Sequence, residues 1–266
     1  MNPIVRLALD EDIGTGDVTS AATVPESRLA QGRFLAREPL IVAGLDLLPE
    51  IYGVPLTILK RDGDACAEDE VLATIRAGAR LLLERERVAL NFLQRLSGVA
   101  TAARAYANAV AGTACRVLDT RKTTPGMRAL EKQAARAGGV TNHRMGLWDA
   151  ILIKNNHIAA AGGVREAIAA ARAASSLPIE IEVRTRRELR EALASGAAHL
   201  LLDNLTPAEA REWIAEIAGR AKVELSGGIT LDNVRAYAEA GADFVSSGAI
   251  THSARAMDIS FRLELA

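Results

Sequence analysis

The sequence predicts an α/β protein in which a small antiparallel α+β unit precedes an incomplete barrel of six or seven parallel strands. Up to residue 111 the apolar positions indicate short paired strands followed by helices. From residue 112 to 255 strands and helices alternate, which is the pattern of a parallel sheet. We therefore expect domains at 1–111 and 112–255, with 256–266 returning to the first domain as a strand.

The composition is that of an ordinary soluble globular protein. The 266 residues are 49% hydrophobic and 24% charged, with a net charge of −1, so bulk electrostatics give no reason to expect nucleic-acid or membrane binding. The two cysteines, Cys66 and Cys115, form neither a disulfide framework nor a metal motif. The N-terminus lacks a signal-peptide pattern, and no stretch approaches the ~18 apolar residues of a membrane span. We expect a cytoplasmic protein.

Residues 1–111 are expected to form the first domain. Apolar positions with helical spacing open the chain, and Gly14 and Gly16 then mark a turn-rich loop with aspartate caps. The turn signal Arg61–Asp64 separates two β-favouring runs, which predicts a strand pair. Helical spacing returns at residue 80, and Ser97-Gly98 predicts a break or kink before a second helix. In chain order we expect a loop at 11–20, an extended segment at 31–43, strands at 56–59 and 71–75, and helices within 80–111.

Residues 112–255 are expected to form the barrel. An ordinary barrel of eight units takes roughly 250 residues, so this stretch is too short for one. Six or seven units could close a smaller or incomplete barrel, and an open doubly wound sheet is the alternative. Polar residues at the strand ends favour the barrel, where such ends converge on one site. The expected strands are 116–119, 150–154, 178–183, 199–203, 222–225 and 244–246, and the expected helices are 127–137, 164–174, 187–194, 207–219 and 231–240.

Two features of the barrel stretch predict that it binds anions. Residues 121–157 carry seven lysines or arginines and only two acids, and such a local cationic cluster suggests a pocket for a small polyanion. Two glycine-rich loops, Ser226-Gly227-Gly228 and Ser247-Gly248, follow the last two expected strands. Barrels commonly hold a phosphate at this place, because glycine lets backbone N–H groups approach an anion closely. We therefore expect a phosphate site at these loops.

Further polar side chains stand at strand ends or in loops. Glu182 and Asp203 end neighbouring strands, and they either form salt bridges to nearby arginines or hold Mg²⁺. Lys154 ends an apolar strand and is either a Schiff-base nucleophile or a fixed cation. Three histidines lie in polar loops without the spacing of a zinc site, so we expect them to contact anions or hydroxyls. These are His143, His157 and His252.

Eight stretches of the chain carry a resemblance to a known family. They read EDIGTGDVTS, ERVALNFLQRLSG, DTRKTTPGMR, GGVTNHRMGLWDAILIKNNH, IEIEV, LLLDN, ELSGGIT and SSGAITHS. Together they resemble quinolinate phosphoribosyltransferase, and they cover nearly the whole chain. The resemblance implies an N-terminal α/β sandwich, an incomplete α/β barrel of the type II phosphoribosyltransferase kind, and at least a dimer. It implies that quinolinate and phosphoribosyl pyrophosphate react with Mg²⁺ present to give nicotinate mononucleotide, pyrophosphate and CO₂ in NAD biosynthesis.

The resemblance also implies roles for individual residues. Seven residues would bind quinolinate: Arg87, Thr120, Arg121, Lys122, His143, Arg144 and Lys154. Of these, Arg87 would enter the site from the partner subunit. Ribose hydroxyls and magnesium would be bound by Glu182 and Asp203, which together with Lys154 would be the catalytic residues. Those implied for the phosphates are Ser226, Gly227, Gly228, Ser247, Gly248, Ala249 and His252.

Two positions depart from the family pattern. Asn155 stands where the family often has Asp, which could alter a loop contact around Lys154. Arg184 follows Glu182-Val183 where an acid is common, which could weaken the charge balance near the metal. Three other functions stay open on the sequence: a molybdenum-transport-associated homologue, a lysine aldolase that uses Lys154, and a non-catalytic phosphosugar-binding protein.

Overall fold

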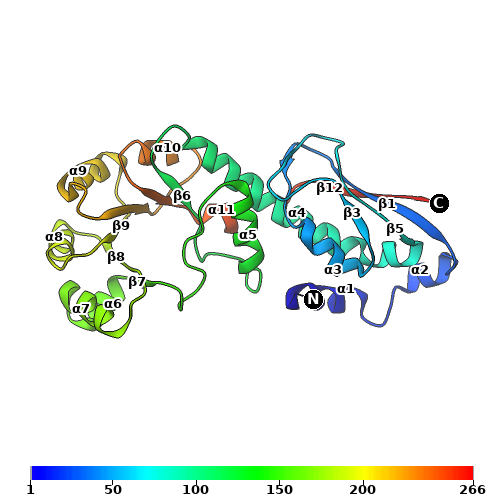
Figure 1. Ribbon diagram of the computed structural model, residues 1–266, viewed down its shortest axis with the longest axis horizontal. Helices are drawn as coiled ribbons and strands as arrows, with labels where there is room; N and C mark the ends of the chain where they lie inside the picture. Colours follow the sequence, from blue (N-terminus) through cyan, green and yellow to red (C-terminus); the bar gives the residue numbers. More distant parts are fainter. Residues whose placement is uncertain (1, 266) are drawn as a thin grey trace. The chain divides into compact units, whose positions relative to one another are not determined.

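The computed structural model describes residues 2–265, which fall into two compact units (Figure 1). The first consists of Met1–Arg104, Thr124–Gly139 and Ser253–Ala266, and the second of Ala105–Thr123 and Val140–His252. Residues 124–139, which the sequence placed with the barrel, thus group with the first unit. The domain boundary between residues 111 and 112 stays a prediction.

The first unit is built on an antiparallel sheet of four strands in the order β12-β1-β5-β3. The expected strand pair at 56–59 and 71–75 is confirmed, and so is the return of the C-terminal strand, which pairs with β1 along its length. The Phe34 ring lies in the core, 4.8 Å from the Phe261 ring and 6.1 Å from the Tyr52 ring, between centroids. The strands are β1 (Leu29–Ala36), β3 (Leu56–Ile58), β5 (Val71–Gly78) and β12 (Ile259–Leu265), with a separate short pair, β2 (Leu40–Ile41) and β4 (Ala65–Cys66).

Helices complete the first unit. The loop expected at 11–20 is shorter than predicted, because α1 runs to Ile13 and α2 begins at Val18. Asp17 caps α2 as expected of an aspartate there, with a carboxylate oxygen that accepts from the backbone N–H of Ser20 at 3.0 Å. The helices are α1 (Pro3–Ile13), α2 (Val18–Thr23), η1 (Leu45–Leu47), α3 (Leu48–Tyr52), α4 (Ala79–Ala109), whose last residues belong to the second unit, and α5 (Arg128–Gly138).

The predicted break at Ser97-Gly98 is wrong, since α4 continues through it. A Cβ added at Gly98 would overlap the carbonyl oxygen of Arg255, so glycine is needed there for close packing. The fully buried Ser97 hydroxyl accepts from the backbone N–H of Ala43 at 3.1 Å. Glycine inside a helix costs only about 1 kcal/mol relative to alanine, and tertiary packing exceeds that cost here.

The second unit is an incomplete α/β barrel. Its six strands are parallel and lie in the order β6-β11-β10-β9-β8-β7, so the first two strands of this unit, β6 and β7, form its two edges. Among the described residues β6 and β7 do not pair with each other, which leaves the ring open. The strands are β6 (Arg116–Leu118), β7 (Ile151–Ile153), β8 (Ile179–Val183), β9 (His199–Asp203), β10 (Lys222–Ser226) and β11 (Phe244–Ser246).

Helices follow the strands of this unit on the outer side of the sheet (Figure 1). The helix expected at 207–219 begins at Pro207 as predicted, and Thr206 caps it with a hydroxyl that accepts from the N–H of Glu209. Two short helices, α6 and α11, were not predicted. No helix in residues 2–265 is long and apolar enough to cross a membrane. The helices are α6 (Asn155–Ala161), α7 (Val164–Ala174), α8 (Arg186–Ala194), α9 (Pro207–Ile217), α10 (Val234–Ala238) and α11 (Ala249–His252).

Candidate active site

Glu182 and Asp203 come together at the carboxyl ends of β8 and β9. Their side chains are 4% and 15% exposed, and Nη2 of Arg184 lies 2.8 Å from Oε1 of Glu182 and 3.2 Å from Oδ2 of Asp203. Nζ of Lys154 lies 3.9 Å from Oε2 of Glu182. The structure thus brings together three residues expected in the site and adds a fourth, Arg184, as an ion-pair partner of both carboxylates.

The two carboxylates fit a magnesium ion chemically. They are oxygen ligands from adjacent strand ends, which is the kind of donor that Mg²⁺ prefers. Oε1 of Glu182 is buried and receives no directed hydrogen bond, although Arg184 lies close to it. An unsatisfied buried carboxylate oxygen is costly, and a bound cation would relieve that cost.

Lys154 stands between β7 and α6. Its backbone N–H donates to Nδ1 of His157 at 2.9 Å, so His157 closes the first turn of α6. The Lys154 side chain is 50% exposed, with the Glu182 carboxylate as its partner. A half-exposed lysine beside a carboxylate lacks the desolvation that a Schiff-base nucleophile needs, and this setting favours a fixed cation.

The segment that carries His143 and Arg144 is anchored by Asp119, which directly follows β6. The Asp119 carboxylate is fully buried and accepts from the backbone N–H of His143 at 2.8 Å and from Nδ2 of Asn142 at 2.6 Å. Nη1 of Arg144 donates to the carbonyl of Ala150 at 3.0 Å. Charge-assisted hydrogen bonds of this kind fix both backbone and side chain.

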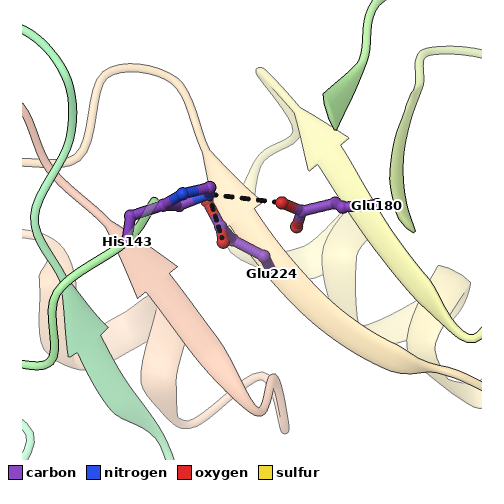
Figure 2. A group of neighbouring side chains, drawn as sticks. All are labelled: His143, Glu180 and Glu224. Carbon is purple, nitrogen blue, oxygen red and sulfur yellow. Dashed lines mark ion pairs between the residues drawn. The ribbon is translucent and has the colours of Figure 1, made fainter. Parts of the chain in front are cut away.

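His143 lies between two buried glutamates, Glu180 on β8 and Glu224 on β10 (Figure 2). Its Nε2 is 3.2 Å from Oε2 of Glu180 and 3.4 Å from Oε2 of Glu224. Burial lowers the pKa of His143, but its hydrogen bonds to both glutamates outweigh this and raise it to about 10. Burial raises the pKa of Glu224. These groups therefore hold a proton tightly at Nε2.

The backbone fixes which ring nitrogen carries that proton. Nδ1 of His143 accepts from the N–H of Arg144 at 2.7 Å, and a protonated Nδ1 could not do so. A pKa of about 10 favours a ring protonated on both nitrogens, whereas this contact requires an Nδ1 without a proton. Because the backbone donor is fixed, the geometry favours a ring protonated at Nε2 alone. The ligand atoms of His143, Glu180 and Glu224 lie within 4.8 Å of one another, close enough to share a metal ion. A metal ion would have to displace the Nε2 proton that faces the two glutamates, so the contacts present favour a proton-sharing group.

Sequence reasoning missed Glu180 and Glu224. The available signal was a charged residue at alternate positions of an apolar strand: Glu180 and Glu182 share one face of β8, as Glu224 and Ser226 share one face of β10. Both missed glutamates are at most 6% exposed. A charged side chain that is buried in a strand needs a polar partner in the interior, and the partner of both glutamates is the side chain of His143.

The residues after β6 add further cations. The N–H of Lys122 donates to the Thr120 hydroxyl at 3.1 Å, which shapes this turn. Burial and the nearby Arg121 guanidinium both lower the pKa of Arg144, so these two guanidiniums lie close to each other. Nε of Arg121 is buried without a hydrogen-bond partner. Close, partly unsatisfied cations of this kind fit an anionic ligand.

The two glycine-rich loops lie against the same region. A Cβ on Gly248 would lie 2.8 Å from Cδ of Lys122 and 3.0 Å from Cδ2 of His252, so loop, lysine and histidine meet there. Gly227, at φ +98°, leaves room for the Asn204 side chain, which a Cβ would overlap.

Ser247 joins the two loops. Its hydroxyl donates to the carbonyl of Ile229 at 2.7 Å and its N–H to the carbonyl of Leu118 at 3.2 Å. Both donors of Ser247 are therefore engaged within the fold. Gly248, Ala249 and His252 remain as the stronger candidates for phosphate contacts on this loop. Ser226, Gly227 and Gly228 are the candidates on the other.

Arg87 lies on the exposed side of α4 in the first unit. Its predicted entry into the site of a partner subunit stays a prediction.

Comparisons with known proteins agree across the whole chain. The family model for the C-terminal domain of quinolinate phosphoribosyl transferase matches residues 99–262, and the model for its N-terminal domain matches residues 17–97. The probable nicotinate-nucleotide pyrophosphorylase (carboxylating) of Bacillus subtilis is 42% identical over 96% of this chain and 90% of its own. The nicotinate-nucleotide pyrophosphorylase (carboxylating) of Mycobacterium leprae is also 42% identical, over 97% of this chain and 95% of its own.

Solved structures share the fold. The crystal structure of NadC from Streptococcus pyogenes has a TM-score of 0.94 at 38% identity and covers 99% of this chain and 96% of its own. The nicotinate-nucleotide pyrophosphorylase of Francisella tularensis has a TM-score of 0.95 at 35% identity, over 99% and 95% of the two chains. The chain belongs to the quinolinate phosphoribosyltransferase family.

Proposed function

We propose that this protein transfers the phosphoribosyl group of phosphoribosyl pyrophosphate to quinolinate and removes CO₂, giving nicotinate mononucleotide and pyrophosphate in NAD biosynthesis. The relatives named as nicotinate-nucleotide pyrophosphorylases, together with a quinolinate phosphoribosyltransferase (decarboxylating) of Nicotiana tabacum, support this reaction. The observation that carries the proposal is the meeting of Lys154 with the Glu182–Asp203 pair at the strand ends of one unit.

Quinolinate would be held by the cations around β6 and β7. Its two carboxylates need at least two fixed positive groups, and bidentate guanidinium contacts suit them. His143, protonated at Nε2 and backed by two glutamates, would help to fix the position of the ring. The side chains proposed for this role are Thr120, Arg121, Lys122, His143, Arg144 and Lys154.

Phosphoribosyl pyrophosphate would lie across the other strand ends. Glu182 and Asp203 would bind ribose hydroxyls and hold Mg²⁺, with the loops at Ser226–Gly228 and Gly248–His252 on the phosphates. A magnesium ion bound there would neutralise charge on the departing pyrophosphate. Ser247 would act by holding the two loops together.

The chemistry then needs no protein nucleophile. As the bond to pyrophosphate breaks, the anomeric carbon gains oxocarbenium character, and the residues act by positioning the reactants and stabilising charge. The ring nitrogen attacks that carbon and becomes quaternary. Loss of CO₂ from the adjacent carboxylate leaves a carbanion that this nitrogen stabilises, and uptake of a proton from solvent at that carbon gives nicotinate mononucleotide. The cationic residues must therefore bind that carboxylate without stabilising the ground state too strongly.

Assembly and location complete the proposal. We propose a homodimer or higher even oligomer in which Arg87 reaches the partner's site, supported by its exposed position on α4. We also propose that the protein works in the cytoplasm. The unpaired, buried thiols of Cys66 and Cys115 support a reducing compartment.

Incubation of the protein with quinolinate, phosphoribosyl pyrophosphate and Mg²⁺ tests the reaction. Nicotinate mononucleotide, CO₂ and pyrophosphate should appear together, and omission of either substrate should stop all three. Absence of product with folded protein would refute the proposal and favour a binding protein. Borohydride trapping of an adduct at Lys154 would instead favour the aldolase.

A further inference from the structure

We propose that Arg184 is an internal competitor for the metal ion: its guanidinium occupies the cation position between Glu182 and Asp203 and must leave before a divalent ion binds. This inference rests on the proposed function for the assignment of those carboxylates to magnesium.

The contacts of Arg184 are those of a bridging cation. One nitrogen, Nη2, lies 2.8 Å from Oε1 of Glu182 and 3.2 Å from Oδ2 of Asp203. A divalent ion bound to both carboxylates would need the space between the same two oxygens, because oxygen ligands lie about 2 Å from Mg²⁺. Guanidinium and metal therefore exclude each other.

The local charges strengthen the competition. Glu182 and Asp203 together carry two negative charges, and Arg184 and Lys154 bring two positive charges within 4 Å of them. The cluster is thus neutral before any metal arrives. A divalent ion that entered without displacing Arg184 would face two cations at short range, which Coulomb repulsion opposes.

The guanidinium is free to move while its backbone stays fixed. The Arg184 side chain is 48% exposed, whereas its backbone N–H donates to Oε2 of Glu188 at 2.8 Å at the start of α8. Glu188 also forms the capping box with Thr185, so the helix start is held independently of the Arg184 side chain. Oε1 of Glu182 receives no directed hydrogen bond from the guanidinium, so the contact is an ion pair without optimal geometry. Such a half-exposed pair can open without unfolding α8.

Titration of the protein with Mn²⁺ alone, with free Mn²⁺ followed by electron paramagnetic resonance, tests the inference. Arg184→Gln removes the charge and should tighten Mn²⁺ binding about tenfold, equivalent to about 1.4 kcal/mol. Arg184→Lys keeps the charge and should bind as weakly as the unmodified protein. Adding Glu182→Gln to Arg184→Gln should abolish the gain.

A matched control lies two residues away. Arg186 pairs with Glu212 at 2.7 Å and with Glu216 at 2.5 Å, outside the carboxylate pair. Arg186→Gln removes the same charge from the same segment and should leave Mn²⁺ affinity unchanged. If it tightened binding equally, the effect would be one of net charge and the inference would be overturned. Unchanged or weaker binding by Arg184→Gln would overturn it as well.

The titration contains neither substrate, so its outcome is separate from the proposed reaction. Tighter Mn²⁺ binding by Arg184→Gln in a protein that makes no nicotinate mononucleotide would support the competition and refute the reaction. If the unmodified protein turns over substrate and Arg184→Gln binds Mn²⁺ with the same affinity as the unmodified protein, the reaction is supported and the competition is refuted. Circular dichroism of each variant verifies that the fold is retained.

Discussion

Replacing Asp119 with asparagine should destabilise the protein and weaken quinolinate binding together. The buried carboxylate accepts at 2.8 Å from the backbone of His143 and at 2.6 Å from the Asn142 amide. Asn at this position can accept only one of these bonds, and its own amide would face the Asn142 amide, donor against donor. A hydrogen bond to a charged group contributes about 1.5–3 kcal/mol, so Asp119→Asn should lower the free energy of unfolding by about 2 kcal/mol.

Quinolinate binding should weaken as well, because the same hydrogen bonds position His143. Loss of one of them should raise the KM for quinolinate roughly tenfold or more and change kcat less. Urea unfolding followed by circular dichroism measures the stability, and initial rates at varied quinolinate measure the KM.

Asp149→Asn is a matched control for stability. The Asp149 carboxylate also accepts two bonds, from the N–H groups of Met145 and Gly146 at 2.6 and 2.9 Å, but it is exposed. Water can replace a lost partner there, so this change should cost less than about 1 kcal/mol. If Asp119→Asn and Asp149→Asn lowered the free energy of unfolding equally, this would refute the reasoning that burial makes the hydrogen bonds of Asp119 more costly to lose.

Three further predictions follow from other parts of the chain. Lys154→Ala should abolish nicotinate mononucleotide formation with unchanged circular dichroism, and near-normal turnover by this variant would contradict the role assigned to Lys154. Mixing Lys154→Ala with inactive Arg87→Ala protein should restore activity. If the mixture stays inactive, the role assigned to Arg87 is contradicted. Gly98→Ala should lower the free energy of unfolding by about 1–3 kcal/mol through overpacking, whereas Gly78→Ala, where a Cβ meets open space, should not. Hydrogen bonding to Arg255 lowers the pKa of Glu38 from 4.5 to about 2. The ionised Glu38 therefore stabilises the folded protein fully above pH 4.5, and this stabilisation is lost towards pH 2. The difference in Tm between the unmodified protein and Glu38→Gln should shrink over that range, and a constant difference would argue against this role of Glu38.

Local patterns were sufficient to predict much of the fold. The alternation of strands and helices after residue 112 and the return of β12 follow from periodicity and turn residues, which are local properties. The continuity of α4 could not be predicted in this way. Glycine at position 98 serves close packing against Arg255, a residue far away in the sequence, and a local pattern cannot distinguish that role from a helix break.

The candidate site could also be predicted only in part from the sequence. Glu182 and Asp203 could be paired in advance, because the ends of adjacent parallel strands converge. Of the two explanations left open for them, the salt bridge is present through Arg184, and it does not remove their chemical fit to a metal. The strand pattern could mark Glu180 and Glu224 as buried acids, but their partner could not be predicted, because it is a histidine delivered by a loop from elsewhere in the chain.

The pairing of β12 with β1 has a consequence for synthesis of the chain. The seven residues of β12 are synthesised after the whole of the second unit, yet they cover the edge of the strand Leu29–Ala36 and bring Phe261 against Phe34. Until then β1 presents unpaired N–H and C=O groups, which invite association with other chains. The first unit therefore completes its sheet only after the second unit has been synthesised, and removal of β12 should lead to aggregation rather than to a smaller folded protein.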